Sequence, residues 1–168
     1  TYLEHVYNNT GRYVDARRQY EEALPIVMAM SNPSPTVDLL GGIASVNAAV
    51  GRLDDSREAY ERAVALASEN GLVEKEITLR RSLADACRSQ GRFSDALDQL
   101  AVAEALLAAH PNAAEESLLH LNRGLTYMNM GEFDDARDDL LKSAELAATL
   151  DEPGPAILAQ INVGFLYR

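Results

Sequence analysis

Apolar and small residues recur along the chain at spacings of three and four, which places them on one face of a helix. They follow four glycines, and the residues after each glycine form a similar sequence. Counted from the glycine, the second position holds a large residue, the fifth a small one, the ninth a large one and the twelfth a small one, as in Phe133, Ala136, Leu140 and Ser143. Small positions let a neighbouring helix approach closely, so each glycine is predicted to precede a packed helix.

The glycines lie at strict intervals of forty residues and organise the whole chain: Gly11, Gly51, Gly91 and Gly131. Upstream of each glycine a second helix is predicted. Its pattern places apolar residues twelve positions before the glycine and mostly small residues seven positions before it. Clusters of proline, glycine, asparagine and aspartate separate the units at residues 31–35, 70–71, 110–112 and 151–155. No strand pattern occurs, so we expect an all-α array of antiparallel helix pairs.

The forty-residue period divides the chain into five units and about nine helices. Residues 1–30 are a partial first repeat, and residues 31–70, 71–110 and 111–150 are complete repeats. Residues 151–168 are the first helix of a truncated fifth repeat. A chain that starts and ends inside repeats is expected to be a fragment of a larger protein. Its uncapped ends would expose apolar faces and favour some self-association.

The combined pattern resembles the tetratricopeptide repeat (TPR). The best copy contains Gly124, Tyr127 and Gly131, and a fifth copy begins with Gly164 and Tyr167. The period of forty is longer than the family's usual value of about 34, as in kinesin light chain, LGN-type scaffolds and bacterial TPR signalling proteins. The resemblance implies a right-handed superhelical solenoid in which the first helix of each pair lines a concave groove that binds proteins.

Charge and composition narrow the choice of partners and compartment. Twenty-six acidic residues against fifteen basic ones give a formal net charge of −11, which disfavours nucleic acid and anionic membranes as ligands. No segment approaches the roughly 18 apolar residues of a membrane span. The single cysteine, Cys87, occupies a position that is tyrosine in three of the other four copies, so it is interpreted as a packing thiol. A cytoplasmic location is expected.

Two asparagines are candidate groove residues. In related TPR proteins, a polar residue nine positions before the turn glycine binds the backbone of a bound peptide. In this chain Asn122 and Asn162 occupy that position. An asparagine side chain both donates and accepts, which suits an extended backbone. The alternative is a solvated helix asparagine.

A charged set on the first helix of the third repeat is a second candidate. Arg81, Asp85 and Arg88 project from one side of that helix, because their spacings are four and three. The two arginines would suit an acidic peptide or a carboxylate. The alternative is a surface network of ion pairs.

An apolar stripe on the first helix of the fourth repeat is the third candidate. Leu121, Leu125 and Met128 form it, with Phe165 at the equivalent position one repeat later. Packing between neighbouring helices is the favoured interpretation, and an exposed site for a partner helix is the alternative.

No residues point to catalysis, a cofactor or a metal. The adjacent acids, such as Asp138 and Asp139, lack the pattern of a calcium loop and are interpreted as helix surface. His5, His110 and His120 do not have zinc-ligand spacing. We therefore expect a non-enzymatic protein-recognition module. The alternative is the ligand-sensing segment of a multidomain bacterial transcriptional activator or signalling enzyme.

Overall fold

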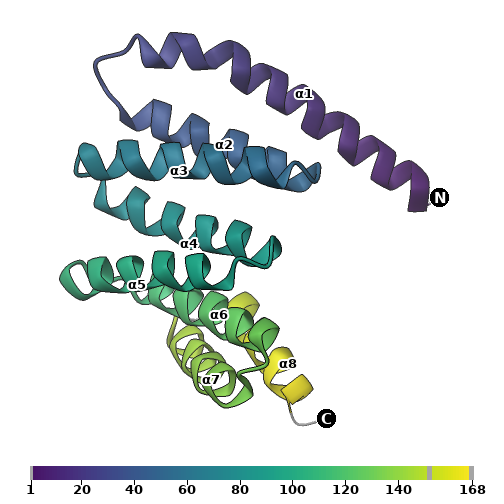
Figure 1. The fold of residues 1–168 in the computed structure, drawn as a ribbon, viewed down its shortest axis with the longest axis vertical. Helices are drawn as coiled ribbons and strands as arrows, with labels where there is room; N and C mark the ends of the chain where they lie inside the picture. The colour runs from purple at the N-terminus through teal and green to yellow at the C-terminus, as the bar shows by residue number, and fades with distance from the viewer. Residues whose placement is uncertain (1, 151–152, 167–168) are drawn as a thin grey trace. The chain divides into compact units, whose positions relative to one another are not determined.

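Short turns join successive helices into antiparallel hairpins (Figure 1). The computed structural model describes residues 2–150 and 153–166, and the side chains of residues 12–150 and 154–166. Over these ranges the secondary structure is entirely α-helical: α1 (Tyr2–Met28), α2 (Ser34–Ala49), α3 (Leu53–Glu69), α4 (Val73–Ser89), α5 (Phe93–Ala109), α6 (Ala113–Met130), α7 (Phe133–Thr149) and α8 (Pro153–Leu166). The all-α prediction is confirmed.

The chain forms two compact units, residues 1–79 and 80–168, whose boundary lies inside α4. In the first unit, α2 packs against both α1 and α3. In the second unit, α6 packs against α5, α7 and α8, and α7 also packs against α8. Each unit therefore contains a hairpin of one predicted repeat, α2 with α3 and α6 with α7, together with neighbouring helices.

The turns that follow α2, α3, α4 and α6 each contain a glycine in the left-handed region. Gly51 has a φ of +79°, and its N–H donates to the carbonyl of Ala48 at 3.0 Å. The next N–H, of Arg52, donates to the carbonyl of Asn47 at 2.8 Å, so two carbonyls at the end of α2 are satisfied. A residue with a Cβ atom would raise the conformational energy by roughly 1–2 kcal/mol in this conformation. The same pair of hydrogen bonds occurs at Gly71, Gly91 and Gly131.

At Gly11 the structure differs from the prediction, because α1 continues through this residue without a turn. This continuation is why the described residues form eight helices where about nine were expected. A glycine inside a helix costs only about 1 kcal/mol relative to alanine, so it does not force a turn by itself. The turn at Gly131, in contrast, accompanies the packing of α6 against α7.

Small residues at the repeat positions bring the paired helices together. Ala136 and Leu140 of α7 are fully buried, and they lie directly against Gly124 of α6. A Cβ atom built on Gly124 would lie 2.8 Å from Cγ of Leu140 and 3.1 Å from the carbonyl oxygen of Ala136. The predicted alternation of small and large positions is therefore the packing surface of the hairpin. Cys87 is also buried, as expected of a packing thiol.

Replacing Gly124 with alanine is expected to destabilise the protein by about 1–3 kcal/mol, because the added methyl group overpacks the contact with Leu140. Gly164 occupies the equivalent repeat position, but a Cβ atom there would meet nothing within 4 Å. Gly164→Ala should therefore stabilise by about 0.5–1 kcal/mol through helix propensity alone. Chemical denaturation of both variants measures the difference. Equal effects of the two substitutions would show that the close approach at Gly124 has no energetic role.

Candidate functional site

The groove candidates Arg81 and Asn122 are brought together in the second unit by neighbouring first helices. Nε of Arg81 in α4 donates to Oε2 of Glu115 in α6 at 3.1 Å, and both side chains are 20% exposed. Nδ2 of Asn122 donates to the backbone carbonyl of Arg81 at 3.2 Å. The partners are 34 and 41 residues apart, close to one repeat period, so these contacts join equivalent helices of successive repeats.

The other two members of the charged set pair with each other. Arg88 donates to Asp85 within α4, and the Asp85 side chain is 52% exposed. Arg81 is instead paired with Glu115, so the two arginines have separate acidic partners in this structure. An anionic ligand would have to compete with these ion pairs, and the carboxylate clamp stays a prediction.

The apolar stripe packs within the second unit. Leu121, with Leu140 and Ala159, forms a buried cluster in which α6, α7 and α8 meet. Leu125 and Met128 are partly buried against this cluster, which is the arrangement that the favoured interpretation describes. A contribution of their remaining exposed surface to partner binding stays a prediction.

The fifth copy contributes less to the candidate site. Asn162 donates to the carbonyl of Leu158 at 2.7 Å, a contact within its own helix. Gly164 lies in α8 with open space beside it, and Tyr167 lies outside the described residues. The two groove asparagines therefore have different surroundings, although they occupy the same repeat position.

An ionic cluster that the sequence did not indicate lies between α5, α6 and α7. Arg123 donates to both carboxylate oxygens of Asp139, at 2.8 and 2.9 Å, and to Oε2 of Glu104 at 3.0 Å. Nδ1 of His120 lies 2.7 Å from Oδ1 of Asp139. Asp139 is only 8% exposed, so its interpretation as helix surface is wrong. The pair Asp138-Asp139 looks uniform in sequence, but the two residues project from different sides of α7.

The contacts within this ionic cluster shift the pKa values of Asp139 and Arg123, which lie at its centre. Burial alone would raise the pKa of Asp139, but hydrogen bonds from His120 and Arg123 and their charges outweigh it, so the pKa lies below the ordinary 3.8. The hydrogen bond to Asp139 raises the pKa of Arg123 above its ordinary value, against the opposing effect of burial. Asp139 is therefore an ionised, fully engaged carboxylate, because a buried charge is stable only when it is paired and hydrogen-bonded.

A separate cavity lies in the first unit, between α2 and the beginning of α4. Its volume is about 270 Å³. Apolar side chains of Val37 and Leu79 line it beside the charged groups of Asp38, Glu74 and Lys75. Lys75 donates to Asp38 across the two helices. The repeat pattern did not indicate this site, because Leu79 is one of its packing positions and the charged residues Asp38, Glu74 and Lys75 fall between the repeat positions.

Within residues 2–150 and 153–166, no helix combines the length and apolar character needed to cross a bilayer. Among the described residues, no three or more histidine, cysteine, aspartate or glutamate side chains are grouped so that they can hold a metal ion.

Asp139→Asn is expected to destabilise the protein by about 3 kcal/mol at neutral pH, because it leaves Arg123 without its buried partner. The pKa of Asp139 is depressed by folding, so its contribution is present above the unfolded value of 3.8 and is lost as the pH falls through the lower folded value. Denaturation at a series of pH values should show the gap between wild type and variant closing in acid. The exposed neighbour provides a control, since Asp138→Asn should change stability by less than about 0.5 kcal/mol. A gap that does not depend on pH would contradict the assignment.

Two protein-family models match the chain, and both are described as tetratricopeptide repeat. They cover residues 36–109 and 118–150. A comparison with curated proteins gives no match.

Several solved structures are similar to this chain. BtubC (BKLC) from P. vanneervenii has a TM-score of 0.84 and 23% identity, over 98% of this chain and 71% of that one. A Rap protein complexed with Competence and Sporulation Factor has a TM-score of 0.81 and 14% identity, over 95% of this chain and 44% of that one. The nearly identical TPR-like repeats of a Podosopora anserina protein assigned as a kinesin light chain have a TM-score of 0.74 and 18% identity, over 98% of this chain and 82% of that one.

At these identities the structural likeness concerns the fold, and it agrees with the family models and with the helix hairpins described above. The chain belongs to the tetratricopeptide repeat superfamily.

Proposed function

We propose that this chain is a non-catalytic protein-interaction module that binds a peptide or a helix on the face formed by the first helices of its pairs. The TPR repeats support a protein-interaction scaffold. The observation that carries the finer proposal is the cavity between α2 and α4, which are the first helices of successive repeats. The proposal requires no cofactor. The buried, single Cys87 fits a reducing compartment such as the cytoplasm.

The chemistry of this cavity suits a polypeptide. Its volume of about 270 Å³ lies just below the roughly 300–1,000 Å³ of sites that enclose small molecules, so it accommodates a side chain or two of a longer ligand. Val37 and Leu79 offer apolar contact, while Lys75 and Asp38 offer a donor and an acceptor to backbone groups. In the second unit, Asn122 and Arg81 present polar groups on the corresponding first helices.

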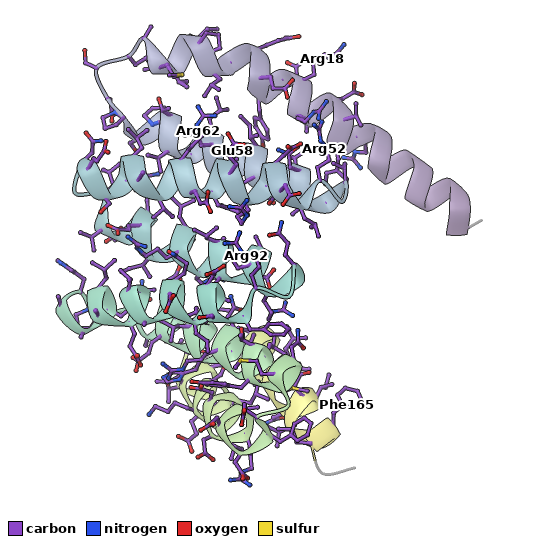
Figure 2. The ribbon with its side chains drawn as sticks, viewed as in Figure 1. Arg18, Arg52, Glu58, Arg62, Arg92 and Phe165 are labelled. Atoms are coloured by element: carbon purple, nitrogen blue, oxygen red, sulfur yellow. The ribbon has the colours of Figure 1, made fainter. Side chains whose placement is uncertain are left out.

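Peptides selected from a displayed library against the immobilised chain should lose about tenfold in affinity when Lys75 or Asn122 is changed to alanine. The loss corresponds to one hydrogen bond to the ligand. Isothermal titration calorimetry measures it, and thermal unfolding checks that each variant folds. Glu58→Ala and Arg62→Ala on α3 are controls, because both side chains are exposed on the second helix of a pair (Figure 2). Affinities that fall equally in the controls, or in none of the variants, would contradict binding on this face.

A ligand-sensing role in a multidomain bacterial transcriptional activator or signalling enzyme is the second candidate. The likeness to the Rap protein, which was crystallised in complex with Competence and Sporulation Factor, favours it. The reading frame that contains this chain distinguishes the two roles. An adjoining DNA-binding or enzymatic domain would favour the sensing role, and its absence would favour a scaffold.

Self-association is proposed through the apolar face of α8. Ile157, Leu158 and Ile161 are each more than half exposed, and Figure 2 shows Phe165 on the same helix. We expect Ile157→Ser combined with Ile161→Ser to abolish concentration-dependent association, because it removes apolar surface that a second molecule would cover. Sedimentation velocity over a wide range of protein concentration measures the effect. A wild-type chain that stays monomeric throughout would rule the association out.

A further inference from the structure

A second cavity lies in the second unit, beside the ionic cluster and between α5 and α6. Its volume is about 280 Å³. The floor is apolar, formed by Leu107 and Leu119, which are 6% and 1% exposed, together with Pro111. The polar border consists of Glu104 from α5 and of Glu116 and His120 from α6. The cavity therefore combines an apolar base with two carboxylates at its edge.

Hydrogen bonds to other residues fix the helical turn that carries Glu116 and hold the ring of His120. Asn112 accepts hydrogen bonds from the N–H groups of Ala114 and Glu115 at 3.1 and 3.2 Å, which fixes the first turn of α6 where Glu116 lies. The ionised Asp139 can only accept a hydrogen bond, so Nδ1 of His120 carries the hydrogen. The other ring nitrogen, Nε2, lies 4.0 Å from Oε1 of Glu116.

The charge at this site is negative after its internal pairs are counted. Arg123 is matched by Asp139 through two hydrogen bonds and also contacts one oxygen of Glu104. The three carboxylates of Glu104, Glu116 and Asp139 outnumber the one guanidinium of Arg123, and they still leave an excess of negative charge when His120 is counted as a cation. The net charge of −11 on the whole chain adds to the attraction for a cation.

The carboxylates of Glu104 and Glu116 border a cavity and do not form a compact site for a single ion. The described residues contain no group of these side chains that is placed to hold a metal ion. The carboxylate side chains are 52% and 45% exposed, so a cation between them can keep part of its hydration. Lysine and arginine match this arrangement, because each has an apolar stem that covers the cavity floor and a charged end that reaches its edge.

We propose that this cavity binds a lysine or arginine side chain of a protein partner between Glu104 and Glu116. The proposal rests on the function inferred above in that the partner is a protein. It concerns a different cavity, in the second unit of the chain. The volume of the cavity is smaller than that of most small-molecule sites, which fits the binding of one long side chain.

The test uses Nα-acetyl-arginine amide and Nα-acetyl-lysine amide as probes in an NMR titration of the isotopically labelled chain. Nα-acetyl-citrulline amide is the neutral control, because it has the shape of the arginine probe without the charge. We expect both cationic probes to shift the signals of Leu107, Leu119 and His120. The arginine probe should bind at least about tenfold more tightly than the citrulline probe. Equal binding of these two probes, or shifts confined to residues outside the cavity, would overturn the proposal.

Variants of the chain separate this site from general attraction by a negative protein. Glu116→Gln should weaken binding of the arginine probe by about fivefold. Asp98→Asn removes the same charge from an exposed position on α5 and should leave binding within about twofold. A loss that is the same in both variants would overturn the proposal.

A steric variant keeps the test informative without altering any charge. Ala108 is an exposed residue at the cavity, and Ala108→Phe should block the probes while both glutamates stay in place. Undiminished binding to a folded Ala108→Phe variant would overturn the assignment. Failure of the groove proposal gives a different result. In that case, changing Lys75 or Asn122 leaves the affinity of the library peptides unchanged, while the cationic probes still shift the signals of the cavity residues.

Discussion

The left-handed turn at the glycine between the two helices of a repeat is the constraint on which the rest of the structure depends. At Gly51, Gly91 and Gly131, two backbone hydrogen bonds end one helix and reverse the chain, and the next helix begins two residues later. The packing positions are counted from this turn, so the turn sets which faces of the two helices meet. The close contact of Gly124 with Leu140 follows from that register, because both residues must come opposite each other for the helices to approach.

The ionic cluster adds a polar connection to this apolar packing. Glu104, Arg123 and Asp139 lie on three consecutive helices, α5, α6 and α7, and their hydrogen bonds link all three. A buried charge without partners would strongly destabilise the fold, but Asp139 receives hydrogen bonds from both Arg123 and His120. The same hydrogen bond orients His120 toward the cavity between α5 and α6, so one structural contact also shapes a surface that can recognise a partner.

The candidate binding surfaces have a common origin in the repeat. First helices of successive repeats lie near each other, which places Lys75 beside Asp38 and Asn122 beside the backbone of Arg81. The apolar positions of these helices are used for packing, as Leu121 shows, and the polar positions between them are left to differ from one copy to the next. Repeat proteins can therefore change the chemistry of a binding face while the packing that supports it stays the same.

The sequence by itself determined the local structure and the period of this protein. The turns at Gly51, Gly91 and Gly131, the buried small positions such as Ala136 and the buried Cys87 follow from residue type and spacing, since backbone conformation and helix periodicity are local properties. The sequence did not determine the helix through Gly11, because the local preference of this glycine was too weak to force a turn. Tertiary structure decided other features, namely which of two adjacent aspartates is buried and which polar residues 34 and 41 positions apart meet. These outcomes depend on which helix lies across from each side chain, and only the packed arrangement of the helices supplies that neighbour.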